Sequence, residues 1–282
     1  MTISIRPLAD TDLETADTIL KLAFRSSVSR LQDLHLYRKI QSDGWFLASQ
    51  QEHPVGMVGA TNYGAFAHVG LMAVHPDAQR QGVGLALMRF LLARLDRQHV
   101  PLVLLDASEM GRPLYDKLGF VAYDETLVFQ RHGNLPMLDR PSNIQSISAR
   151  ELDELVQWDT TVFGADRSKV FQALLALFPE RAFMLRDETG QVAGSLFAQK
   201  SRIGPWVTLQ SQNAEVLLQA ALSLPYEETC SVFVPSVNQE AIELLQCYGF
   251  EQVGADRHMG RGRGEPPGQR KKIYAQTSLA IG

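Results

Sequence analysis

One stretch of the sequence decides the fold, and it reads Val69-Gly70-Leu71-Met72-Ala73-Val74-His75-Pro76-Asp77-Ala78-Gln79-Arg80-Gln81-Gly82-Val83-Gly84-Leu85-Ala86-Leu87-Met88-Arg89-Phe90-Leu91-Leu92. An apolar run of strand type ends at His75-Pro76, a polar segment with two glycines follows, and apolar residues with helical spacing begin at Leu85. The stretch therefore predicts a strand, a tight loop and a helix. Gly82 and Gly84 let backbone N–H groups approach an anion at the start of the helix, where unpaired donors and the helix dipole favour negative charge. We expect a phosphate-bearing cofactor there.

The loop at residues 79–84 distinguishes between known phosphate-binding motifs. It lacks the Gly-Lys-Ser/Thr of a Walker motif and the three glycines of the dinucleotide fingerprint. It matches Gln/Arg-x-x-Gly-x-Gly/Ala, the pyrophosphate loop of the GNAT superfamily of acetyl-CoA-dependent N-acetyltransferases, which this sequence resembles. The alternative for the motif alone is a surface turn between a strand and a helix that happens to contain glycines.

A second motif supports the resemblance. In GNAT enzymes, the strand after the pyrophosphate-loop helix is followed by a short helix that ends in Leu-Tyr-x-x-x-Gly-Phe. This sequence has an apolar run at residues 102–105 and then matches the motif with Leu114, Tyr115, Gly119 and Phe120. Glycine suits the end of a helix because it adopts positive φ without a Cβ penalty.

Length and composition set the remaining bounds. The chain has 282 residues, 45% of them hydrophobic, and this length and composition predict two globular domains. The net charge of −4 gives no general reason to expect that nucleic acid binds. Cys230 and Cys247 are too few for a disulfide framework or a thiolate zinc site, and we expect no metal. No apolar run reaches the length of a membrane span, and residues 1–7 lack a signal peptide's apolar segment. We therefore expect no membrane association and a cytoplasmic location.

The pattern of strands and helices occurs twice. The first unit is expected to have strands at residues 3–8, 45–48, 55–60, 69–74, 102–105 and 121–130, with helices ending near residue 24 and at 31–40. Residues 131–136 are expected to be a linker. The second unit repeats this order, and its Gly249-Phe250 pair lies 130 residues after Gly119-Phe120. We expect an α/β (α+β) protein with two tandem GNAT-like domains, residues 1–132 and 140–282, each with a mixed, mainly antiparallel central sheet flanked by helices.

The second copy differs from the first where chemistry is expected. Its counterpart of the glycine loop, residues 209–214, contains no glycine, and Leu245 stands at the position of Tyr115. The second domain therefore resembles a degenerate GNAT copy without a pyrophosphate loop or a proton donor. Its glycine- and arginine-rich run at residues 260–264 favours a mobile loop between the last two strands over an anion site.

The resemblance implies a set of cofactor-binding residues. The organising strand would line the pantetheine arm and polarise the thioester through backbone N–H groups, and the loop would hold the pyrophosphate of acetyl-CoA. The residues concerned are Met72, Ala73 and Val74 in the strand and Gln79, Arg80, Gln81, Gly82, Val83, Gly84 and Leu85 in the loop and helix start.

Tyr115 is the general acid that the resemblance implies, and the alternative is a tyrosine that packs its ring at a helix end. The general base stays open between His68, His75 and a water relay. The family often places an asparagine after its fifth strand, where this chain has Ser108-Glu109.

The acceptor side rests on weaker patterns. Asp166, Arg167 and Trp206 could form an acceptor pocket at the domain interface, and the alternative is a surface ion pair and a core tryptophan. The overall expectation is an N-acetyltransferase that transfers acetyl from acetyl-CoA to a primary amine of a small molecule, peptide or protein by direct attack. A non-catalytic acyl-CoA sensor or scaffold is the alternative. The chain would be a monomer that forms an intramolecular pseudo-dimer, or a homodimer.

Overall fold

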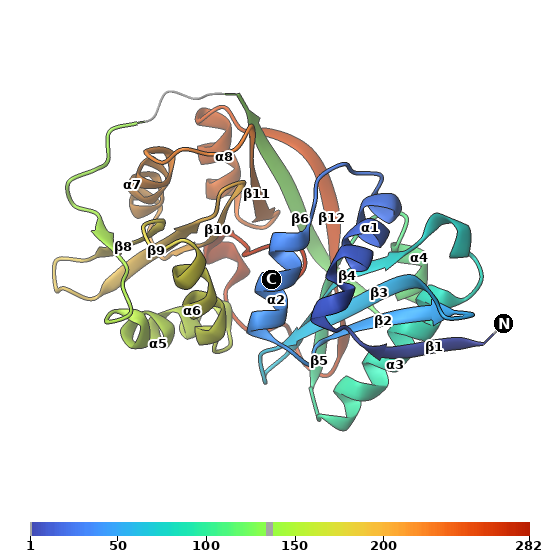
Figure 1. The fold of residues 1–282 in the computed structure, drawn as a ribbon. Helices are drawn as coiled ribbons and strands as arrows, with labels where there is room; N and C mark the ends of the chain where they lie inside the picture. Colours follow the sequence, from blue (N-terminus) through green and yellow to red (C-terminus); the bar gives the residue numbers. More distant parts are fainter. Residues whose placement is uncertain (1, 134–137) are drawn as a thin grey trace.

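The computed structural model describes residues 2–133 and 138–282 and contains two similar halves (Figure 1). The first half consists of β1 (Ile3–Pro7), α1 (Leu13–Phe24), α2 (Leu31–Ile40), β2 (Trp45–Gln50), β3 (His53–Asn62), β4 (Ala67–Val74), α3 (Val83–Arg97), β5 (Leu102–Ala107), α4 (Arg112–Lys117) and β6 (Val121–His132). The second half consists of β7 (Gln145–Ser146), α5 (Leu152–Phe163), α6 (Ser168–Leu177), β8 (Ala182–Arg186), β9 (Val192–Ala198), β10 (Arg202–Thr208), α7 (Ser211–Leu222), β11 (Thr229–Pro235), α8 (Gln239–Cys247), β12 (Glu251–Gly262) and β13 (Ile273–Ala275).

The strands of both halves form one continuous sheet. Their order is β1-β2-β3-β4-β5-β12-β6-β11-β10-β9-β8-β7, and β13 pairs with β10 off this path. The pairs β4–β5 and β10–β11 are parallel, and the others are antiparallel. The expected mixed, mainly antiparallel sheet flanked by helices is confirmed.

The two halves exchange their last strands. β12 lies between β5 and β6 of the first half, while β6 lies between β11 and β12 of the second half. Figure 1 shows β6 and β12 as two long strands that run side by side from one half into the other. The strand expected at residues 121–130 therefore does not close the first unit alone, because the neighbours that satisfy its backbone hydrogen bonds both come from the second half.

The helices cover both faces of this sheet. Along β2, Trp45 and Leu47 belong to one hydrophobic core, and the alternating residues Phe46 and Ala48 belong to another, as the period of a strand requires. The first core also contains the apolar faces of α1, α2, α5 and α6, so it joins the two halves. The second core lies under α3, and a third lies under α7 and α8. No helix among the described residues is both long and apolar enough to span a membrane.

Two expected loops are shorter than the sequence indicated. Residues 131 and 132 belong to β6 because they pair with β11, and residues 134–136 of the expected linker lie outside the described residues. Residues 260–262 of the glycine- and arginine-rich run belong to β12 and pair with β5. Gly260 packs closely against the Tyr123 ring, since a Cβ would lie 2.5 Å from it, so a larger residue there would displace this ring.

A buried ion pair fixes the connection between α5 and α6. The Arg167 guanidinium donates to both carboxylate oxygens of Asp159, at 2.7 and 2.6 Å, and both side chains are 1% exposed. The guanidinium also lies over the rings of Phe163 and Phe171. Arg167 therefore does not form a surface pair with Asp166, whose carboxylate is exposed and accepts from the Ser168 backbone N–H.

The Asp159→Ala variant should lose about 3–5 kcal/mol of unfolding free energy, because it leaves a buried guanidinium without its counter-charge. The double variant Asp159→Ala/Arg167→Met should recover part of this loss, since no uncompensated charge stays buried. Urea unfolding followed by circular dichroism measures both. Asp166→Ala is the control and should cost about 1 kcal/mol or less; an equal loss in the control would show that the buried pair is not the cause.

Candidate active site

The organising strand β4 separates from its neighbour β5 halfway along. The two strands pair from Ala67 to Val69 on β4, and the pairing then ends. At the same point β4 contains a bulge: Gly59 of β3 faces Gly70, Met57 faces Ala73, and Leu71 has a φ of 51°. A bulge leaves an extra residue outside the ladder and re-aims its backbone groups. Strand separation and bulge together open a cleft beside β4.

The cleft has a volume of about 770 Å³, and both halves contribute to its walls. The first half supplies the β4 bulge, the end of β5 and Tyr115, and the second half supplies residues of β11, β12 and the segment 278–280. Met72 lies in the wall, whereas Ala73 is 3% exposed and packs in the core between the halves. Ser108 also lines the cleft, at the position where the family often has asparagine.

The glycine loop forms the expected turn at the start of α3. Residues 76–78 make a short 3₁₀ turn, Arg80 and Gly82 have φ values of 60° and 83°, and α3 begins at Val83. The backbone N–H groups of residues 81–85 have no acceptor among the described residues. Gly84 packs against β4, since a Cβ there would lie 2.9 Å from the Met72 side chain. The loop thus presents unpaired donors at the positive end of a 15-residue helix, which is a favourable site for an anion.

Tyr115 lies at the end of α4, with its ring against Phe120 and 7% of the residue exposed. Its side chain lines the cleft, and its hydroxyl forms no hydrogen bond with the described residues. Burial, followed by the nearby charge of Asp256, raises the pKa of Tyr115. The hydroxyl is therefore protonated at neutral pH and available to a ligand in the cleft.

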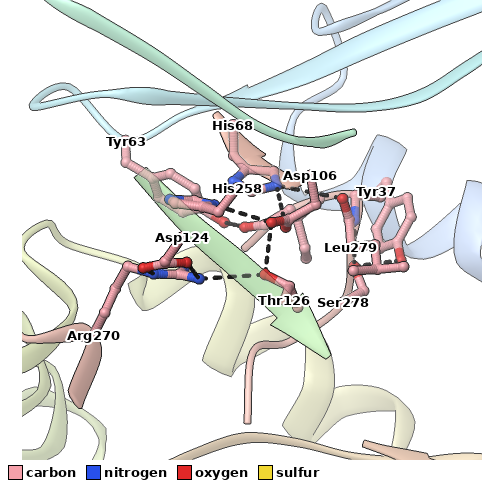
Figure 2. A network of polar contacts seen from close by, with 12 residues as sticks. Tyr37, Tyr63, His68, Asp106, Asp124, Thr126, His258, Arg270, Ser278 and Leu279 are labelled. Carbon is pink, nitrogen blue, oxygen red and sulfur yellow. Dashed lines mark hydrogen bonds and ion pairs between the residues drawn. The ribbon is translucent and has the colours of Figure 1, made fainter. Parts of the chain in front are cut away.

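Asp106 forms the centre of a buried polar network next to the cleft (Figure 2). Its carboxylate accepts from Thr126 Oγ1 at 2.7 Å and lies 3.0 Å from His258 Nδ1 and 3.5 Å from His68 Nε2. Gln276 can donate to the second oxygen at 3.2 Å, with its amide turned to satisfy both neighbours. Burial opposes ionisation, but the two histidines outweigh it and hold the pKa of Asp106 well below its usual range. Asp106 is thus an anion whose acceptor positions are occupied.

The network connects strands that are far apart in the sequence. Asp106 comes from β5, Thr126 from β6 and His258 from β12, so their contacts hold the exchanged strand in register. On the other side of Thr126, Arg270 forms a bidentate pair with Asp124. No group of three or more His, Cys, Asp or Glu side chains within residues 2–133 and 138–282 is arranged to hold a metal ion.

The two histidines expected as possible bases do not face the cleft. His68 is 1% exposed, and its Nε2 lies 3.3 Å from the Leu279 carbonyl oxygen and close to Asp106. His75 accepts from the Asp77 backbone N–H in the turn before α3. The geometry therefore supports a structural role for both side chains.

The matching opening in the second half is filled. β10 and β11 pair only at residues 202–203 of β10, as β4 and β5 do over a short stretch. β13 then enters beside β10, pairing Ala275 with Trp206 and Ile273 with Val207. The loop before α7 has only two residues, because β10 ends at Thr208 and α7 begins at Ser211. The second half therefore has neither a cleft nor a phosphate loop at this position.

The residues expected to form an acceptor pocket lie elsewhere. Trp206 is fully buried and packs against Tyr274 in the core under α7 and α8. Asp166 is exposed, and Arg167 belongs to the buried pair with Asp159. None of the three lines the cleft. The placement of Trp206 agrees with the alternative of a core tryptophan, whereas the alternative of a surface pair between Asp166 and Arg167 does not form, because Arg167 pairs with buried Asp159.

Asp256 is a cleft residue that no sequence motif indicated. Asp256, on β12, lies opposite Thr126 and lines the cleft together with Tyr115. Burial, followed by the negative charge of Asp106, raises the pKa of Asp256 to about 6. No local motif marks this residue, because its place in the site depends on the strand exchange.

Comparisons with known proteins agree with this architecture. Two models described as "Acetyltransferase (GNAT) domain" match residues 16–138 and 155–275. Holothin acyltransferase from Pseudoalteromonas sp. (strain SANK 73390) is 28% identical over 258 residues, which cover 89% of this chain and 86% of that protein.

Solved structures show the same fold over nearly the whole chain. A protein from Pyrococcus horikoshii, described as a candidate acetyltransferase, matches with a TM-score of 0.84 and 27% identity over 99% of this chain and 96% of that chain. A GCN5-related N-acetyltransferase from Sphaerobacter thermophilus matches with a TM-score of 0.70 and 14% identity over 96% and 98% of the two chains. The chain therefore belongs to the GNAT acetyltransferase family, as an enzyme with two domains of that family in tandem.

Proposed function

We propose that this protein is an N-acyltransferase that transfers an acetyl group from acetyl-CoA to an amine acceptor in the cleft beside β4. The observation that carries the proposal is the combination, in one half only, of an open strand separation, a loop with unpaired N–H groups and a protonated tyrosine. The similarity to an acyltransferase over most of both chains supports the same class of reaction. Acetyl-CoA would supply the activated thioester.

The residues of the first half fit the cofactor. The N–H groups of residues 81–85 would bind the pyrophosphate, with Arg80 and Gln79 beside it. Gln79 holds the loop in place by donating to the Val74 carbonyl oxygen at 3.1 Å. The pantetheine arm would follow β4 past Val74 and Met72 to the bulge, where a backbone N–H of Leu71 or Met72 would polarise the thioester carbonyl.

The acceptor would occupy the remaining part of the cleft. Its walls come from the connection between α1 and α2 and from residues 227–231 of the second half. They carry one cation, Arg30, and two carboxylates, Glu227 and Glu228. Arg202 of β10 also lines the cleft, but its guanidinium is paired with Asp33. Holding amine and thioester together removes much of the entropic cost of the reaction. Tyr115 would protonate the departing thiolate.

CoA should bind once per chain, and Gly82→Asp should remove most of this binding. The variant places a carboxylate where the pyrophosphate would lie, and a Cβ at this position meets no protein atom within 4 Å. Isothermal titration calorimetry measures both stoichiometry and affinity. Gly82→Asn is the matched control, because asparagine tolerates the left-handed φ of 83° without adding charge. Two sites per chain, or equal affinity in both variants, would contradict the assignment.

Tyr115→Phe should lower kcat by about 10- to 1,000-fold while CoA affinity and melting temperature change little. The ring keeps its contact with Phe120, and the lost hydroxyl has no hydrogen-bond partner among the described residues. The measurement is thiol release from acetyl-CoA with a panel of alkylamines and arylamines. Tyr123→Phe, a change on the half-exposed part of β6, is the control and should retain wild-type kcat. If Tyr115→Phe turns over at the wild-type rate, Tyr115 is not the general acid. If the wild type binds CoA but releases no thiol, the function of an acyl-CoA sensor is favoured instead.

A further inference from the structure

We propose that Asp256, supplied by the exchanged strand of the second half, is the general base that takes the proton from the acceptor amine. The inference rests on the proposed acyl transfer and assigns a role that His68 and His75 do not fill. It makes the second half part of the catalytic machinery rather than only a wall of the cleft.

The strand exchange brings Asp256 to the cleft. β12 pairs with β5 through Arg257 and Ala107 and with β6 through Asp256 and Thr126. Asp256 therefore lies beside the end of β5, where β4 and β5 have separated and the cleft is open. Its side chain lines the cleft that Tyr115 also lines, and it forms no ion pair or side-chain hydrogen bond in the described part of the chain. A carboxylate with free acceptor positions thus faces the space where an acceptor would bind.

Other ionisable groups near the reacting atoms are less suited to the role. Asp106 also borders the cleft, but hydrogen bonds and ion pairs from Thr126, His258 and His68 occupy its oxygens. Glu227 and Glu228 lie in the connection before β11, next to Thr229, which pairs with His132 at the other end of β6 from Thr126, the partner of Asp256. Tyr115 is protonated and serves the leaving group. Asp256 is the unoccupied carboxylate on the wall that Tyr115 shares.

The charges around Asp256 tune it for proton transfer. Burial and the fixed negative charge of Asp106 on β5 raise the pKa of Asp256 to about 6. On β12 itself, burial lowers the pKa of His258, although Asp106 acts in the opposite direction. His258 therefore adds little positive charge at neutral pH. From β6, the facing residues Thr126, Val128 and Gln130 carry no charge, and Arg270 is held by Asp124. A carboxylate in this setting is ionised at neutral pH and more basic than an exposed aspartate.

The amine nitrogen forms a bond to the acyl carbon while the C–S bond breaks. The Asp256 carboxylate accepts the proton that leaves the nitrogen, and the Tyr115 hydroxyl gives its proton to the sulfur. The products are the amide and free thiol, with one proton on Asp256 and tyrosinate at Tyr115. Transfer of a proton between these groups through water restores the starting state.

The test compares Asp256→Asn with the wild type over pH 5–8 in the thiol-release assay, with acetyl-CoA and the best amine of the panel. The ratio of the two kcat/KM values for the amine cancels the amine's own ionisation. We expect a ratio of about 10- to 1,000-fold at pH 7.5 that falls by about 10-fold towards pH 5, as Asp256 becomes protonated in the wild type. Asp256→Glu should recover part of the activity, and Asp96→Asn, an exposed change on α3, should leave it unchanged.

A second readout needs no substrate. Because the folded-state pKa of Asp256 lies above its unfolded value of about 3.9, ionisation of this group destabilises the fold as the pH rises through 4 to 6. The melting temperature of Asp256→Asn should therefore rise relative to the wild type between pH 4 and pH 7.5, and CoA affinity should not change. A lower melting temperature at pH 7.5 would show that Asp256 is structural and overturn the proposal.

The activity outcomes separate the two claims. If the wild type is active and Asp256→Asn has the same activity, Asp256 is not the general base. The same conclusion follows if the ratio of wild-type to variant kcat/KM does not vary with pH. Either result leaves the acyltransferase function intact. A wild type that acylates no amine of the panel overturns the proposed function, and the base falls with it.

Discussion

The structure depends on the pairing of β12 between β5 and β6. These contacts give β5 and β6 a common neighbour and join two repeated units into one sheet. Burying an unpaired strand edge would leave backbone N–H and C=O groups without partners, so neither unit can omit the strand that the other provides. The Asp106 network reinforces the same place with contacts from three strands. The walls of the cleft follow directly from this arrangement, because β12 and β6 form part of them.

The repeated fold has become asymmetric at its two equivalent openings. In the first half, β4 and β5 separate beside a bulge and leave a cleft, while in the second half β13 occupies the space beside β10. The same chain segment that fills the second opening continues towards the first. Its Leu279 carbonyl oxygen lies 3.3 Å from His68 Nε2, and Ala280 packs on Gly70. A short polypeptide segment therefore closes one opening and shapes the other. This explains why one half keeps the features of a binding site and the other serves as support.

Local sequence patterns predicted what depends on local physics. The glycine loop and the motif around Tyr115 were identified because positive φ and a helix start impose residue types at fixed spacing. The strand exchange was not predictable in this way, since alternation along residues 251–262 does not reveal which strands they will pair with. The sequence also does not show whether a tryptophan or an Asp-Arg pair lies in a core or in an acceptor pocket, because both environments use the same residues. In the structure, Trp206 and Arg167 are buried. Asp256 was not predicted as a site residue, because the sequence around it contains no recognisable motif.

The strand exchange also has a consequence for the order in which the chain folds. Ala107 pairs with Arg257, so the partner of β5 is synthesised 150 residues after it. Contacts of such long sequence separation slow folding, because the entropic cost of closing the loop precedes the stabilisation that strand pairing provides. During synthesis, the first half would leave the ribosome with β5 lacking one neighbour and β6 lacking both, although the residues of the first half are already present. Its sheet, and with it the cleft, can be completed only after β12 has been synthesised, which makes this protein an informative case for chaperone dependence.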